Sequence, residues 1–166
     1  MLMLLAAIAC TTEGADDFTG GNFTVTTIGV EDGCYDNALN TVFLPEGDGT
    51  TNDWANAIYL PGFDELPAEV EIDLQEPFQD LTVTFEQGGE DELVVTDALQ
   101  TEVQLQDDSD CIADLNANVS LVVLDADSVE GSVSLENSNI SSATDDCPVF
   151  TSDPCTITLD ITGVRQ

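Results

Sequence analysis

The chain has 166 residues, of which 34 are Asp or Glu, one is Arg and none is Lys or His, so its formal net charge at pH 7 is −33. This charge repels nucleic acids and anionic membrane surfaces. The missing side chains exclude a Ser–His triad, a Cys–His pair, a lysine Schiff base and a lysine for phosphates. The apolar fraction of 42% is that of a globular protein rather than of a disordered acidic tail.

The first ten residues, MLMLLAAIAC, form an apolar run that ends in small residues and a cysteine. The run is too short to cross a bilayer as a helix and has the length of the apolar part of a secretory signal. Ala7-Ile8-Ala9-Cys10 resembles the lipobox of bacterial lipoproteins. The resemblance implies a signal peptide over residues 1–9 and a lipidated Cys10 as the first residue of the mature chain. The other interpretation of the run is an apolar strand or helix of the fold.

Residues 10–21 follow as the lipidated cysteine and a polar, Gly-rich stretch, which predicts a flexible tether. Residues 22–166 then have the length of a single domain. In the sorting pattern of such lipoproteins, Thr11 rather than Asp after the cysteine implies the outer membrane. We therefore expect an exported protein at the cell envelope whose lipid is its one contact with the membrane.

Beyond the tether, apolar residues alternate with Thr, Ser and acidic residues, and this period of two is typical of half-buried strands. Turn signals rich in Gly, Pro and Asp separate these segments. The pattern predicts an antiparallel β-sandwich, Ig-like or jelly-roll-like, of about seven to nine strands. Residues 34–44 are the best candidate for a short helical turn. The expected strands include 22–30, 69–74, 81–85, 101–105, 112–124, 128–138 and 156–164.

Cys10 aside, four cysteines remain, and an even number in an exported chain predicts two disulfides. Antiparallel pairing of the first and last strands would bring Cys34 to Cys155. A hairpin over 112–138, turning near residue 126, would place Cys111 opposite the segment before Cys147. The alternative pairing is Cys147–Cys155 with Cys34–Cys111, and the sequence leaves both open.

Both cysteine pairings gather acidic residues at one end of the domain. Clustered carboxylates on loops are the ligands that Ca²⁺ prefers, so this acidic pole is a candidate calcium site, and calcium is the one cofactor we consider. The alternative is a solvated acidic surface without a metal. The residues of the acidic pole are Glu31, Asp32, Asp36, Asp107, Asp108, Asp110, Asp145, Asp146 and Asp153.

An aromatic group forms a second candidate ligand-binding site. Trp54, Tyr59 and Phe63 lie close together between Asp53 and Leu66. Exposed rings on a rigid loop could stack on sugars or insert into a partner. The alternative is that the rings pack into the core beneath a long connection.

Together these patterns predict a lipid-anchored, non-catalytic binding or structural module of the cell envelope. Its partner would be an envelope protein or a glycan and not a nucleic acid, and no pattern in the sequence indicates an oligomeric state. One alternative is a Ca²⁺-dependent adhesion or glycan-binding domain. A second is a carboxylate-based hydrolase, which would need two carboxylates about 5–10 Å apart across a cleft.

Overall fold

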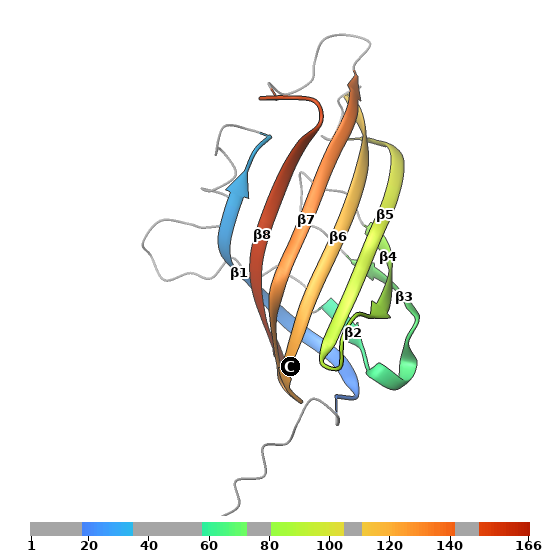
Figure 1. The fold of residues 1–166 in the computed structure, drawn as a ribbon, viewed down its shortest axis with the longest axis vertical. Helices are drawn as coiled ribbons and strands as arrows, with labels where there is room; N and C mark the ends of the chain where they lie inside the picture. The colour runs from blue at the N-terminus through green and yellow to red at the C-terminus, as the bar shows by residue number, and fades with distance from the viewer. Residues whose placement is uncertain (1–17, 35–57, 73–80, 105–110, 142–149) are drawn as a thin grey trace, which may run out of the picture.

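The computed structural model describes residues 18–34, 58–72, 81–104, 111–141 and 150–166. Within these ranges the structure is almost entirely β-strand, with one turn of 3-10 helix, η2 (Phe63–Glu65), between the second and third strands (Figure 1). The strands are β1 (Gly20–Asp32), β2 (Ile58–Pro61), β3 (Ala68–Ile72), β4 (Leu81–Gln87), β5 (Glu92–Gln104), β6 (Ile112–Asp125), β7 (Ser128–Ser141) and β8 (Cys155–Arg165).

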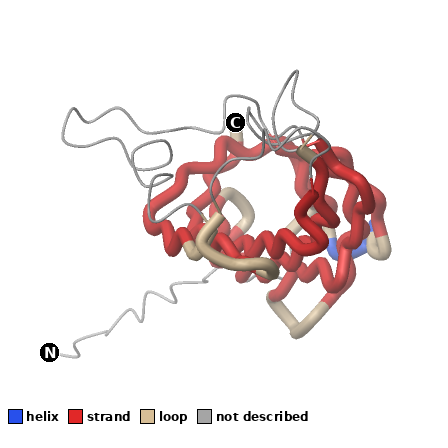
Figure 2. The backbone as a smooth tube through the Cα atoms, turned by 90° about the horizontal axis from the view of Figure 1, so that it is seen from above, coloured by secondary structure: helices blue, strands red, loops and turns tan. Residues whose placement is uncertain are grey.

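These eight strands form one sheet, in the order β2-β1-β8-β7-β6-β5-β4-β3, and every neighbouring pair is antiparallel. The strands at the two ends of this order, β2 and β3, contact each other, so the sheet is nearly closed into a barrel (Figure 2). The prediction of an all-β antiparallel fold is confirmed, but one curled sheet replaces the two facing sheets of a sandwich. Alternation gives each strand a buried and an exposed face in both architectures and therefore does not distinguish them.

The first and last strands lie side by side, as the cysteine argument assumed. Their pairing runs from Phe23 opposite Arg165 to Asp32 opposite Ile157. The expected hairpin is also present, because β6 and β7 pair along their lengths and turn at residues 126–127. Odd-numbered strands therefore run toward one end of the barrel, the Cys34 end, and even-numbered strands run back toward the other, the Arg165 end. The helical turn expected at 34–44 lies, apart from Cys34, outside the described residues.

Most inward-facing residues of the barrel form one large apolar cluster, because alternate residues of each strand point inside, and Cys111 and Ala113 form a small second cluster. Full burial of one such aliphatic or aromatic side chain contributes about 1.5–3 kcal/mol. A wholly apolar gap of about 30 Å³ remains in this interior. An apolar cavity that binds benzene is about five times larger, roughly 150 Å³, so this gap is too small for an organic ligand of that size. The largest fully buried residues are Phe23, Val25, Leu60, Val83, Phe85, Leu93, Val129, Leu135, Asn137, Ile157 and Leu159.

Candidate functional site

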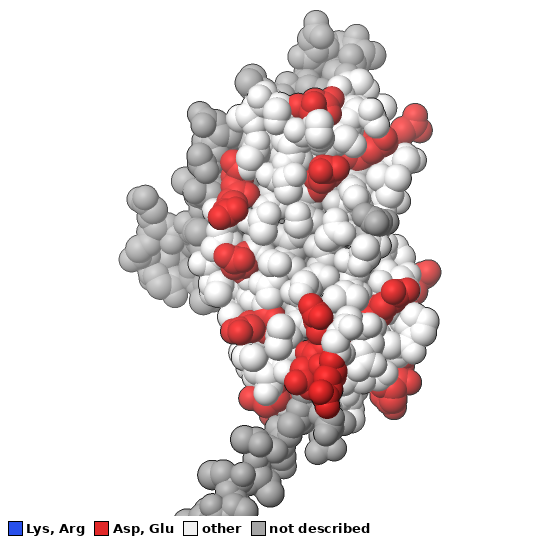
Figure 3. Space-filling model, in the orientation of Figure 1, with Lys and Arg blue, Asp and Glu red and all other residues white. Residues whose placement is uncertain are grey.

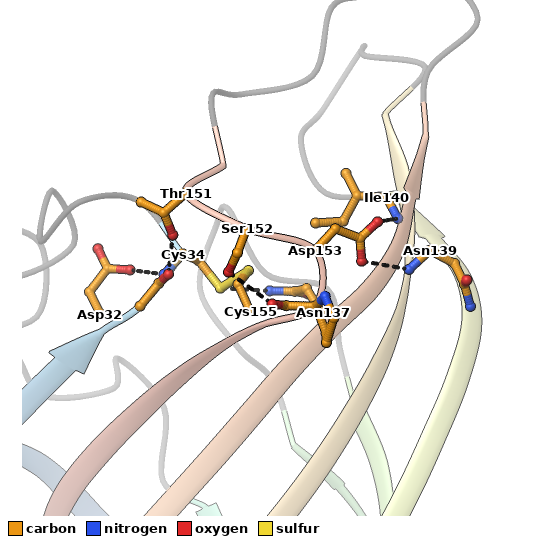
Figure 4. Close-up of a disulfide and its surroundings, with 11 residues drawn as sticks. Asp32, Cys34, Asn137, Asn139, Ile140, Thr151, Ser152, Asp153 and Cys155 are labelled. Carbon is orange, nitrogen blue, oxygen red and sulfur yellow. Dashed lines mark hydrogen bonds between the residues drawn. A yellow bond between two sulfur atoms is a disulfide. The ribbon is translucent and has the colours of Figure 1, made fainter.

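A disulfide joins β1 to β8 at the Cys34 end of the barrel (Figure 4). It links Cys34, just after β1, to Cys155, the first residue of β8, and both cysteines are buried. The Cys34 amide donates to Asp32 Oδ1 at 2.9 Å, and Asn137 Nδ2 donates to Cys34 Sγ at 3.7 Å. This bond is the one expected from antiparallel pairing of the first and last strands. Cys111 is also disulfide-bonded and fully buried, but its partner lies outside the described residues, so a Cys111–Cys147 bond stays a prediction.

Two β-bulges lie side by side at this end, one on each side of β6. Along β5, Gln100 pairs with Leu115 and Val103 with Ala113, so three steps on β5 match two on β6. Along β7, Ile112 pairs with Ser141 and Asp114 with Ser138, so β7 also carries one extra residue. Bulges of this kind are found preferentially at barrel rims and beside functional sites.

Each bulge contains a non-glycine residue in the left-handed region of the backbone, Glu102 at φ 56° in β5 and Asn139 at φ 53° in β7. Such residues are uncommon and persist where surrounding contacts hold them in place. Asp114, on the intervening strand β6, supplies those contacts. Its Oδ1 accepts the Glu102 amide at 3.1 Å, and its Oδ2 accepts Asn139 Nδ2 at 2.7 Å. One carboxylate therefore ties both bulges together.

A second carboxylate holds the outer side of the β7 bulge. Asp153, just before β8, accepts the amide of Asn139 on Oδ1 and the amide of Ile140 on Oδ2, each at 3.1 Å (Figure 4). A bulge removes backbone amides from the sheet ladder, and buried or half-buried amides need partners. Asp153 supplies them and so stabilises the bulge.

Between the bulges lies a cleft of about 270 Å³. It is nine times larger than the gap in the barrel interior and close to the lower limit of ligand pockets, about 300 Å³. Its wall combines two carboxylates, an amide and a hydroxyl with apolar surface. The lining residues are Glu102, Ile112, Ala113, Asp114, Asn139 and Ser141. This polar cleft is the candidate functional site of the described residues.

The acidic pole predicted from the sequence is described only in part. Asp32 and Asp153 hold backbone amides, as above, and Glu31 is exposed on β1. The other six residues of the pole lie outside the described ranges. Within those ranges no group of three or more His, Cys, Asp or Glu side chains is placed to hold a metal ion. A calcium site at the pole therefore stays a prediction, and Asp32 and Asp153 have structural roles.

Two of the three residues of the predicted aromatic site, Tyr59 and Phe63, lie in the described part of the chain, so a ligand site formed with Trp54 stays a prediction. Phe63 is half-buried and its ring centroid lies 5.7 Å from that of Phe18, so it packs at the Arg165 end. Tyr59 is exposed, and its hydroxyl donates to Glu65 Oε2 at 2.6 Å. This hydrogen bond raises the pKa of Tyr59 and lowers that of Glu65, which also accepts the Gly62 amide. Trp54 lies outside the described residues.

Arg165, the one cation of the whole sequence, lies at the opposite end of the barrel from the cleft. Its guanidinium carbon is 5.9 Å from the ring centroid of Phe18 and 5.6 Å from that of Phe23, and its Nε lies 3.4 Å from Asp127 Oδ1. Phe18, just before β1, is 3% exposed. Aromatic and cation–π contacts therefore hold the segment that leads into β1 at the Arg165 end of the barrel.

Carboxylates are scattered over the outer face of β5 to β8 (Figure 3). Between them lie Ser, Thr and Asn and the exposed apolar side chains of Leu99, Val122, Leu124 and Val164. No basic side chain is visible among the described residues on that face. This face of the barrel therefore carries carboxylates over its whole length rather than one localised acidic patch.

Comparisons with protein-family models, curated proteins and solved structures find no match for this chain. Among the described residues, no helix has the length and apolar character needed to cross a membrane. Because the comparisons find no match, the function of the cleft residues is inferred from their geometry and chemistry.

Glu102, Asp114 and Asn139 lie on three different strands and are not among the site residues predicted from the sequence. The signal that points to them is the interruption of alternation on either side of the central strand, after residue 100 and after residue 138. Both interruptions fall opposite Ala113 and Asp114, and this coincidence is visible only once the strand register is known.

Proposed function

We propose that this protein is a lipid-anchored, non-catalytic protein of the cell envelope that presents the polar cleft at the Cys34 end of its barrel to a binding partner. The proposed anchor is Cys10 in the lipobox-like Ala7–Cys10 segment, with the outer membrane as the expected location. The disulfide supports an oxidising compartment, because structural disulfides form and persist in exported proteins.

The observation that carries this proposal is the placement of the cleft and of Phe18 at opposite ends of the barrel. Phe18 is packed at the Arg165 end, only eight positions after Cys10. On β6, eleven steps separate Asp114 in the cleft from Asp125 at the Arg165 end. At about 3.3 Å per residue, this is roughly 36 Å of strand. A lipid on Cys10 would therefore place the Arg165 end near the membrane and leave the cleft facing away from it.

The cleft favours binding over catalysis. Both oxygens of Asp114 accept hydrogen bonds from the two bulges, so this carboxylate positions backbone rather than shuttling a proton. A general acid or base of a carboxylate hydrolase has to exchange protons during the reaction. Such a hydrolase needs a pair of carboxylates, and with Asp114 in a positioning role Glu102 is the one other carboxylate in the lining of the cleft.

Fractionation of a Gram-negative host expressing the full chain tests the anchor. Wild-type protein should pellet with membranes, and Cys10→Ser should move it to the soluble fraction. Thr11→Ser, the neighbouring substitution, serves as the matched control and should leave the protein with the membranes. Wild-type protein in the soluble fraction, or Cys10→Ser protein that still pellets, would contradict the proposal.

A further inference from the structure

The charge around the polar cleft is entirely negative in the described part of the chain. Glu102 and Asp114 line the cleft, and Asp153 binds the amides of the β7 bulge next to it. Arg165, the one cation of the sequence, lies at the other end of the barrel. Roughly 36 Å of strand separates the ends, several times the Debye length of about 8 Å at physiological ionic strength. Arg165 therefore does not compensate the carboxylates of the cleft.

The acceptors of the cleft have capacity for a further ligand. Each carboxylate oxygen has two lone pairs, and each Asp114 oxygen accepts one hydrogen bond from a bulge. Glu102 is exposed at the rim of the cleft. Because the contacts to Asp114 fix both bulges in advance, little side-chain or backbone freedom at Asp114 and Asn139 is lost when a ligand binds.

Three classes of ligand would interact differently with the two carboxylates that line the cleft. A neutral sugar would bury two carboxylates without neutralising them, which is costly. A calcium ion needs six to eight oxygen ligands, and no metal-holding group of three or more His, Cys, Asp or Glu is found among the described residues. A guanidinium or ammonium group compensates the charge and donates several charge-assisted hydrogen bonds at once. The volume of about 270 Å³ also leaves space for an alkyl stem beside Ile112.

We infer that the polar cleft binds a basic side chain, an arginine or lysine of a partner protein, whose cationic group contacts Glu102 and Asp114. This inference rests on the proposed binding role and adds to it the chemistry of the partner. The net charge of −33 would also speed the approach of a basic partner, because electrostatic steering raises association rates.

The test is a titration of the full chain in mild detergent, followed by NMR. The probe is Nα-acetyl-arginine amide, and its control is the citrulline analogue, which has nearly the same shape and no charge. The arginine probe should move the amide signals of Asn139 and Ile140, which belong to the β7 bulge, and should leave Thr162 unchanged. The citrulline analogue should move none of them at the same concentration.

Two variants remove the same unit of charge at different places. Glu102→Gln should weaken binding of the arginine probe by about tenfold, the order expected when a charge-assisted contact is lost. Glu130→Gln, at an exposed position near the other end of β7, should leave the affinity within about twofold, because long-range charge is screened. Equal effects of the two variants, shifts spread over the whole barrel, equal binding of citrulline, or no shift at all would each overturn the inference. None of these outcomes depends on the lipid. Failure of the titration would therefore overturn the basic ligand only, and the membrane fractionation would test the lipid anchor separately.

Discussion

Removal of the Cys34–Cys155 disulfide should strongly destabilise the barrel. The bond closes a loop with a sequence separation of 121, the span from the end of β1 to the start of β8. In the chain-entropy treatment, a loop of this length lowers the entropy of the unfolded chain by roughly 16 cal/mol/K, or about 5 kcal/mol at 25 °C. Disulfides often stabilise proteins by less than this limit, so we expect the free energy of unfolding of Cys34→Ala/Cys155→Ala to be about 3–5 kcal/mol lower than that of the wild type.

The assay is urea unfolding followed by far-UV circular dichroism at one fixed NaCl concentration. The midpoint should fall, and the slope should rise, because an unfolded chain without the bridge exposes more surface. Thr156→Ala, at an exposed position next to Cys155, is the control and should change stability by less than about 0.5 kcal/mol. A loss below about 1 kcal/mol in the double alanine variant would refute the claim that this bond constrains the unfolded chain.

Three further predictions concern the Arg165 end and the charge. Arg165→Gln should lower the free energy of unfolding by about 1–3 kcal/mol, because contacts of the guanidinium and its alkyl stem with the rings are lost. Asp127→Asn should lower it by less than about 1 kcal/mol, because Asp127 is 76% exposed. Equal losses for the two variants in urea titrations would contradict this prediction. Tyr59→Phe should raise the pKa of Glu65, which carboxyl ¹³C NMR measures. The hydrogen bond stabilises the fold above the ordinary Glu pKa of 4.5, and its contribution is lost as the pH falls through the lowered pKa of Glu65. The stabilities of the variant and the wild type should therefore become equal in acid. Raising NaCl from about 10 mM to 1 M shortens the Debye length from about 30 to 3 Å and should raise Tm, because it screens the repulsion between carboxylates. Each kcal/mol of relieved repulsion should raise Tm by about 2–4 °C. A Tm that does not change with NaCl concentration would contradict this prediction.

Strand positions were predictable where alternation is unbroken. The strands β6, β7 and β8 match the expected segments closely, and so does the hairpin turn between β6 and β7. The first half of β5 was not predicted, because the bulge between Val95 and Ala98 shifts its alternation. The strand β2 was not predicted either, because Ile58–Pro61 is short and ends in a proline, a residue more typical of turns.

The barrel and the cleft were beyond the reach of single-sequence reasoning for a common reason. Closure of the sheet depends on the contact between its two end strands, and no local pattern encodes it. The cleft similarly depends on register, since Glu102 and Asn139 lie on different strands and meet only through Asp114. The Cys34–Cys155 bond was accessible because it follows from one topological assumption, the pairing of the first and last strands.

The most direct test of the anchored-barrel account is the intact mass of the mature protein extracted from membranes. The account predicts a chain that begins at Cys10 and carries acyl-glycerol mass on that residue, which is lost when Cys10 is replaced by Ser. A mature chain that begins at another residue, or a mass equal to that of the unmodified polypeptide, would contradict it.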